Sequence, residues 1–187
     1  VPSSIARTWT VAPDDTVLRV EVDQLGQSYT LLASGAVELR TDSGQLIDTV
    51  PSALPLGLSM APSLAVDEQG GILLAARART AIPGGSSYLW RMVRGDDDEW
   101  SQDWVEQLDN AVERFAYRSG AIAALTSDVE GGTILETPHY LERFSGILEG
   151  IPFADWRVEV PRPAYDVTFD RFGGILVASP KNLARVP

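Results

Sequence analysis

Few side chains in this sequence could carry out acid–base or metal chemistry. His139 is the single histidine and cysteine is absent, so an imidazole-based mechanism must use His139, and thiolate or multi-histidine metal sites are excluded. No Gly-x-Ser-x-Gly nucleophile motif occurs. A lone loop histidine is more often a surface residue than a catalyst, and spacing places no partner beside it. We therefore predict no catalytic residue, no metal ligand and no cofactor.

Acidic residues form one dense run. Four of them follow Gly95 directly, and others continue the run until Arg114. Paired carboxylates could bind Ca²⁺, but the run lacks the alternate ligands and central glycine of an EF-hand loop. We interpret Gly95 to Glu99 as a solvated turn between two strands.

Composition narrows the class of protein. The chain has 187 residues, 44% of them hydrophobic, which suits a single globular domain over residues 1–187. Its 26 acidic against 15 basic residues give a net charge of −11, which argues against nucleic-acid binding. No apolar run reaches the roughly 18 residues of a membrane span. The lack of cysteine and the start at Val1 favour a processed chain of the periplasm, the cell surface or the exterior.

The elements that must position these residues come from a fourfold internal repeat. Each copy contains a strand, a turn with glycine and a second apolar strand. The turn glycines are Gly26, Gly70, Gly120 and Gly173, spaced by 44, 50 and 53 residues. Residues 67–75 read Asp-Glu-Gln-Gly-Gly-Ile-Leu-Leu-Ala, and residues 170–178 read Asp-Arg-Phe-Gly-Gly-Ile-Leu-Val-Ala. Glycine allows positive φ in such a turn, and aspartate can accept its backbone hydrogen bonds.

Two more elements recur in fixed order around these turns. A tryptophan precedes three of them, at Trp9, Trp104 and Trp156. A Leu-x-Arg sequence follows three of them, ending at Arg91, Arg143 and Arg185, with Val37-Glu38-Leu39 as a degraded fourth copy. Each repeat therefore reads as four short strands, which is typical of a propeller blade.

We predict an all-β fold, a small β-propeller of about four four-stranded blades. The predicted blades cover residues 17–50, 62–106, 112–160, and 164–187 together with 5–11. In this arrangement the N-terminal strand pairs with the C-terminal blade and closes the ring. The blade tryptophans are read as packing between blades.

Other arrangements remain open at this level. A β-sandwich also has short strands with glycine turns. The apolar residues from Trp100 to Val112 also have helical spacing, so a short helix could replace the outer strand of the second blade. The four repeats could be a small ring, half of a larger ring built from two chains, or a fragment of a longer propeller.

The Val-Asp-x-x-Gly-Gly-Ile-Leu-Leu-Ala pattern at residues 66–75 resembles the blade signature of the NHL, gluconolactonase-like and two-component-regulator propeller families. The resemblance is at the level of the fold and carries no catalytic residue. It implies a ligand on the face formed by the loops that join the second and third strands of each blade. The binding residues expected there are Arg77, Arg79, Asp128, Glu130, His139, Tyr140 and Lys181.

Repeated structural residues without repeated catalytic ones favour a non-enzymatic scaffold. Its loops would present a protein or small-ligand site, in an envelope or secreted assembly, and a homodimer or larger assembly is possible. A metal-assisted hydrolase or lactonase of the propeller type is the first alternative. A carbohydrate-binding propeller that uses Trp90 and Trp100 is the second.

Overall fold

The computed structural model describes residues 13, 15–51, 53, 58–78, 87–108, 110–127, 139–146, 154–160 and 164–187, without the side chains of 58–61 and 77–78. Every regular element within these residues is a β-strand, and all pairings are antiparallel. None of the described residues forms a helix that is long and apolar enough to cross a membrane.

The strands form four separate sheets in chain order. The first blade is β1 (Val17–Val22), β2 (Ser28–Leu32), β3 (Val37–Arg40) and β4 (Leu46–Val50). The second is β5 (Leu58–Val66), β6 (Ile72–Ala78), β7 (Ser87–Arg94) and β8 (Trp100–Leu108). The third is β9 (Ala111–Arg118), β10 (Ala121–Ser127), β11 (His139–Ser145) and β12 (Ala154–Val160). The fourth has three described strands, β13 (Asp166–Phe169), β14 (Ile175–Ala178) and β15 (Leu183–Val186).

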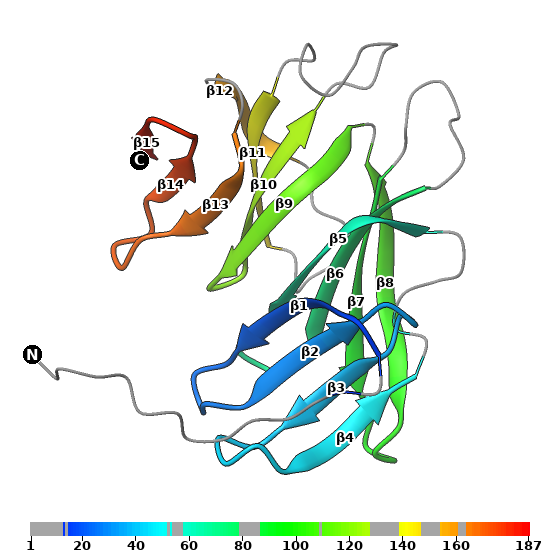
Figure 1. Cartoon of the computed structure of the whole chain (residues 1–187). Helices are drawn as coiled ribbons and strands as arrows, with labels where there is room; N and C mark the ends of the chain where they lie inside the picture. Colours follow the sequence, from blue (N-terminus) through cyan, green and yellow to red (C-terminus); the bar gives the residue numbers. More distant parts are fainter. Residues whose placement is uncertain are drawn as a thin grey trace, which may run out of the picture.

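The four blades follow one another around a shared centre, with β1, β5, β9 and β13 innermost (Figure 1). The fold is a four-bladed β-propeller, so the predicted all-β architecture is confirmed. Each blade is a meander, so the turns between its first and second strands point to one end of the ring, which we call the hairpin end. The loops between second and third strands point to the opposite end.

Apolar packing joins successive blades. Leu31, Ile72 and Trp90 belong to a cluster between the first and second blades. Similar clusters join the second to the third blade and the third to the fourth. Trp104 and Trp156 pack against these two clusters, which confirms their predicted role between blades.

No such cluster joins the fourth blade to the first among the described residues. On the first blade Val22 is 61% exposed, and on the fourth Leu183 is 69% exposed. The predicted closing strand, residues 5–11, and Trp9 lie outside the described residues, so ring closure by that strand stays a prediction.

The segment from Gly95 to Leu108 forms a turn and the outer strand of the second blade. The helical alternative for Trp100 to Val112 is wrong, because β8 runs from Trp100 to Leu108 and pairs with β7 along its length. Gly95 to Glu99 form the turn between these strands, as predicted, with the N–H of Gly95 donating to the carbonyl of Glu99 at 2.8 Å.

Candidate functional site

An ion pair stabilises the hairpin turn in two of the four blades. In the second blade one oxygen of Asp67 accepts the N–H groups of Gln69 and Gly71, each at 2.8 Å, and the other accepts Nε of Arg91 at 2.7 Å. In the fourth blade Asp170 binds its turn in the same way and accepts Nε of Arg185 at 2.6 Å. The Asp of the turn and the Arg of the Leu-x-Arg element are therefore two halves of one contact.

This contact explains the second glycine of the Asp-x-x-Gly-Gly turn. A Cβ at Gly71 would lie 2.9 Å from Nε of Arg91, and a Cβ at Gly174 would lie 2.7 Å from Cζ of Arg185. Both distances are shorter than the contacts of real Cβ atoms, so a side chain there would displace the guanidinium. The displacement is costly at Gly71, because the Arg91 side chain is only 6% exposed, and easier at Gly174, because that of Arg185 is 51% exposed.

The other two blades each keep one half of the pair. In the first blade Asp23 is present, but Leu39 takes the place of the arginine and Gln27 that of the second glycine. In the third blade Arg143 is present, but the turn has no aspartate and Ala121 takes the place of the second glycine. The sequence changes are matched, since the small glycine is lost wherever the pair is lost.

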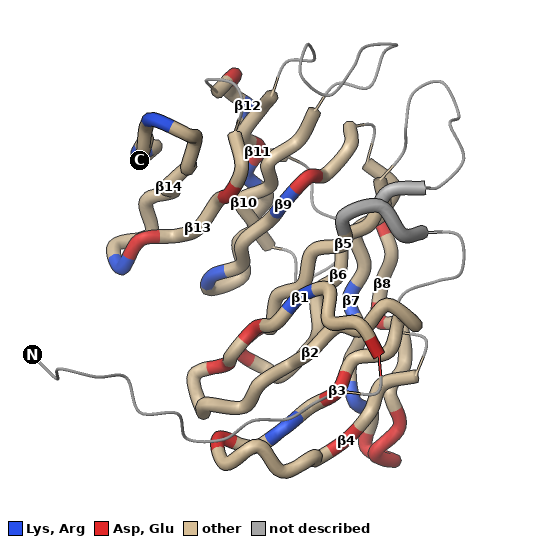
Figure 2. The backbone as a smooth tube through the Cα atoms, in the orientation of Figure 1, with Lys and Arg blue, Asp and Glu red and all other residues tan. Residues whose placement is uncertain are grey.

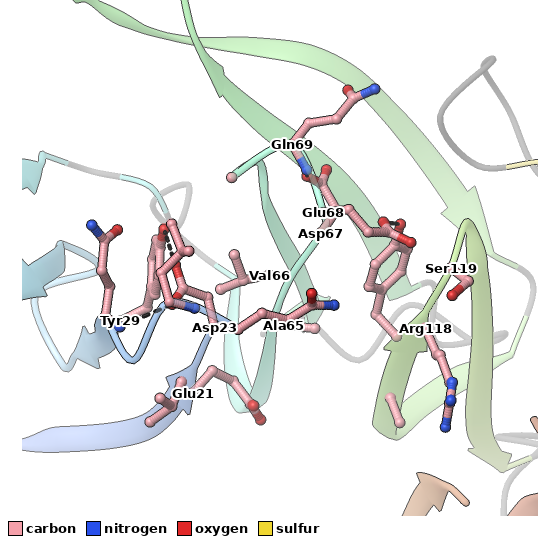
Figure 3. A pocket seen from close by; sticks show the side chains of 17 residues that line it. Glu21, Asp23, Tyr29, Ala65, Val66, Asp67, Glu68, Gln69, Arg118 and Ser119 are labelled. Atoms are coloured by element: carbon pink, nitrogen blue, oxygen red, sulfur yellow. Dashed lines mark hydrogen bonds between the residues drawn. The ribbon is translucent and has the colours of Figure 1, made fainter. Parts of the chain in front are cut away.

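A cavity of 680 Å³ opens at the hairpin end of the axis, between the turns of the first three blades (Figure 3). The turns between β1 and β2, β5 and β6, and β9 and β10 form its walls. The charged side chains that line it are Glu21, Asp23, Asp67, Glu68 and Arg118. The cavity therefore carries an acidic lining with one guanidinium at the third blade.

Most of the cavity carboxylates have structural partners. One oxygen of Asp23 accepts the N–H groups of Leu25 and Gln27 at 2.8 Å, and its other oxygen lies 3.5 Å from the hydroxyl of Tyr29. Burial and the Asp23 charge raise the pKa of Tyr29 to about 12. Tyr29 is therefore a neutral donor to Asp23 at physiological pH.

Glu68 is held across the boundary between the second and third blades. The hydroxyl of Tyr117 donates a hydrogen bond to Glu68 and accepts one from the N–H of Gly120 at 2.9 Å. Burial and the hydrogen bond to Glu68 raise the pKa of Tyr117 well above its ordinary value. This contact ties the two hairpins into one wall of the cavity.

Glu21 differs from the other cavity carboxylates. Desolvation by the neighbouring residues raises the pKa of the Glu21 carboxyl group, and the negative charge of Asp166 on the fourth blade raises it further. The neighbouring Arg19 has a lowered pKa, because burial and the charge of Arg114 outweigh the opposing effect of Asp166. Charges from the first, third and fourth blades therefore interact around the centre of the ring.

No group of three histidine, cysteine, aspartate or glutamate side chains within the described ranges is arranged to hold a metal ion. The expected absence of a metal and a cofactor stays a prediction, since other residues lie outside these ranges.

Three of the seven binding residues expected from the sequence have described side chains. The reading of His139 as a surface loop residue is wrong, because His139 is the first residue of β11, is buried, and accepts the N–H of Ala164 at Nδ1 at 3.3 Å. The ring of Tyr140 lies 3.6 Å from the guanidinium carbon of Arg157. Lys181 is exposed in the turn between β14 and β15.

The other four are Arg77, whose side chain is not described, and Arg79, Asp128 and Glu130, which lie outside the described residues. The site expected on the loops between the second and third strands therefore stays a prediction. His139 and Tyr140 are adjacent in β11, so their side chains lie on opposite faces of the sheet. His139 and Tyr140 therefore cannot contact the same ligand on one face of β11.

The tryptophans expected to bind sugars need a correction. Trp90 is only 1% exposed, and its Nε1 donates to the carbonyl of Ala53 at 2.9 Å. Nε1 of Trp100 donates to Asp48 at 2.9 Å, which links the outer strands of the first two blades. Trp90 is a core residue and cannot stack on a ligand.

Sequence reasoning missed the cavity at the hairpin end, although it found the turns that form it. The blade topology could have predicted it, because the first turn of every blade must lie at the same end of the ring.

No protein-family model matches the sequence, and no curated protein matches it. Solved structures are similar in fold. The major Malassezia sympodialis allergen Mala s 1 has a TM-score of 0.60 and 14% identity, over 94% of this chain and 63% of that chain. BBS1N in complex with ARL6DN has a TM-score of 0.55 and 11% identity, over 95% of this chain and 54% of that chain.

The complex of KlAtg21 with the coiled coil of AgAtg16 gives a TM-score of 0.54 and 13% identity, over 92% of this chain and 53% of that chain. At such identities the likeness shows the fold alone. The chain spans 63% of the allergen structure and 54% of BBS1N, so it corresponds to part of each of these longer folds.

Proposed function

We propose that this chain is a non-enzymatic β-propeller module that binds a partner at the hairpin end of its axis. The observation that carries the proposal is the 680 Å³ cavity, to which the turns of three blades contribute (Figure 3). Concave sites that gather loops from several rigid elements commonly bind ligands and partners. The lack of cysteine is compatible with an envelope or secreted assembly.

The contacts of the cavity residues support binding over catalysis. Asp23 and Asp67 each accept two backbone N–H groups, and Glu68 accepts the hydroxyl of Tyr117. A general acid or base has to exchange a proton with its substrate, which such structural contacts oppose. Glu21 is the cavity carboxylate without a described hydrogen bond. Among the residues that line the cavity there is no histidine.

A protein is the partner class that we favour. BBS1N was solved in complex with ARL6DN, and KlAtg21 with the coiled coil of AgAtg16, both with folds similar to this one. The acidic lining of the cavity would suit a partner segment that carries lysine or arginine.

Site-specific photo-crosslinking tests which end of the ring meets the partner. A photoreactive amino acid replaces Gln24, which is exposed on the cavity wall, and in a separate protein it replaces Asn182, which is exposed in the turn between β14 and β15 at the other end. Neither side chain has a described hydrogen bond, so both replacements should fold. We expect a discrete protein adduct in extracts of the native cells from position 24. Adducts from position 182 alone, or from neither, would refute binding at the hairpin end, and hydrolase activity lost on blocking the cavity would refute the non-enzymatic role.

A further inference from the structure

A second and smaller cavity lies at the hairpin end, between the third and fourth blades. Its volume is 280 Å³. Three arginines line it, Arg118, Arg143 and Arg171, together with the rings of Phe169 and Phe172. None of its lining residues is acidic. The chain as a whole has a net charge of −11, so a cavity lined by three arginines differs in sign from the rest of the protein.

Arg143 is the arginine that the repeat has left without its aspartate. Its counterparts Arg91 and Arg185 bind a turn carboxylate at 2.7 and 2.6 Å. For Arg143 the one described carboxylate within ion-pair distance is Asp155, at 3.9 Å from Nε. Nε of Arg143 is buried and has no hydrogen-bond partner. A buried N–H donor without an acceptor costs stability unless a ligand or water supplies one.

The other two arginines are held in place by contacts that leave their positive charge without a described carboxylate partner. The guanidinium of Arg118 donates to the carbonyl of Asp170, and to that of Arg171 at 2.9 Å. The guanidinium of Arg171 lies over the ring of Phe172 at 4.5 Å. Figure 2 shows the basic positions of the β9–β10 and β13–β14 turns side by side. These contacts pre-organise the cations around the cavity before any ligand arrives.

We propose that this cavity binds an anionic group, a carboxylate or phosphate, carried on an apolar body. Guanidinium groups bind both anions through paired N–H donors. The anion would take the place of the missing turn aspartate at Arg143, and the apolar body would lie against Phe169 and Phe172. The two cavities share Arg118 and Ser119, but Arg143, Arg171 and the two phenylalanines line only this one, so the proposal does not depend on the function proposed for the axial cavity.

Substitution of Ser119 tests the proposal with a matched pair of variants. Ser119 lines the cavity and has a φ of 48°, a backbone conformation that aspartate and asparagine both adopt readily. Ser119→Asp supplies an internal carboxylate, whereas Ser119→Asn has the same shape without the charge. The probes are phenylacetate, phenyl phosphate and neutral benzyl alcohol, titrated against the whole chain and followed by NMR shifts of the Ala121 amide and the Arg143 Nε–H.

We expect one or both aromatic anions to bind and benzyl alcohol not to bind. Anion binding should be weaker by about tenfold or more in Ser119→Asp than in Ser119→Asn, the effect of roughly 1.4 kcal/mol, because the two variants differ in charge and not in shape. Tighter binding of phenylacetate would assign a carboxylate, and tighter binding of phenyl phosphate would assign a phosphate. Equal weakening by the two Ser119 variants would overturn the proposal, as would the absence of shifts at about 10 mM of either anion.

Arg143→Leu provides an independent check. Leu39 occupies the corresponding position of the first blade, so the repeat accepts leucine there. Arg94→Leu is the control, because the Arg94 side chain is 43% exposed in the second blade and does not line the cavity. Anion binding should be lost in Arg143→Leu and kept in Arg94→Leu. Retention of full affinity in a folded Arg143→Leu protein would exclude the site.

Discussion

Asp67→Asn should be among the most destabilising single-atom changes in the second blade. Asparagine keeps an oxygen for the two turn N–H groups, but it replaces the oxygen that accepts Nε of Arg91 by an NH₂ group. The Asp67 side chain is 0% exposed and that of Arg91 is 6% exposed. Water therefore cannot replace the lost carboxylate, and the guanidinium stays buried without its main counter-charge.

Removal of one partner from a buried ion pair costs about 3–5 kcal/mol. Arg91 keeps two other contacts, to Asp103 and to the side-chain oxygen of Gln69, both at 2.8 Å. We therefore expect the lower end of this range, about 3 kcal/mol, since part of the guanidinium remains satisfied. For a chain of this length such a loss lowers the melting temperature by about 6–12 °C.

Asp170→Asn in the fourth blade is the internal control. The same atoms meet there, but the Arg185 side chain is 51% exposed and can be hydrated after the change. The loss should be clearly smaller than for Asp67→Asn, and added salt should reduce it further because exposed pairs are screened. Thermal and urea unfolding at low and high salt measure both variants. Equal losses in the two blades would refute the view that burial decides the contribution of this contact.

Three further changes have defined outcomes. The raised pKa of Glu21 means that the folded state favours its protonated form, so stability falls as pH rises above the ordinary value of 4.5. Glu21→Gln should therefore raise the melting temperature at about pH 7 and leave it unchanged at about pH 4. Trp90→Ala should cost about 3–5 kcal/mol in urea unfolding, through the cavity it leaves and the lost bond to Ala53. Deletion of residues 1–12 should lower the melting temperature and promote aggregation, seen by light scattering, if the N-terminal segment closes the last blade.

The fold was predictable because each repeat encodes its turn locally. Gly26, Gly70, Gly120 and Gly173 all have positive φ, the conformation for which glycine is required. The surrounding apolar runs become the paired strands of each hairpin. Local signals of this kind act within a few residues and can be recognised in a single sequence.

The stretch from Trp100 to Val112 was ambiguous for a physical reason. Its apolar residues fit both a helical and an alternating pattern over this short length. Pairing with β7 decides between them, because Trp90 lies opposite Val105 and Arg91 opposite Trp104. This information comes from a neighbouring strand and is absent from the stretch itself.

The candidate sites were less predictable, because they depend on contacts between distant residues. Asp67 and Arg91 are 24 positions apart, and the sequence treats the turn and the Leu-x-Arg element as separate motifs. The sequence alone does not show that the turn aspartate contacts this arginine. Leu39 is therefore interpreted as a degraded copy, and the missing aspartate of the third turn is interpreted as ordinary sequence variation. The seven expected binding residues could be selected only from a resemblance, and the side chains of four of them are not described.

The Asp–Arg contact is complete in alternate blades of the ring. The second and fourth blades keep the complete Asp–Arg contact, which fixes their hairpins with internal partners. The first and third blades keep one half each, and each remaining half lines a cavity at the hairpin end. Asp23 lies in the axial cavity, and Arg143 lies in the cavity between the third and fourth blades. Asp23 has another internal partner, the hydroxyl of Tyr29, whereas Nε of Arg143 is buried with no hydrogen-bond partner. A buried donor of this kind needs water or a ligand, so it is in the third blade that the lost contact leaves the group on which the proposed anion site rests.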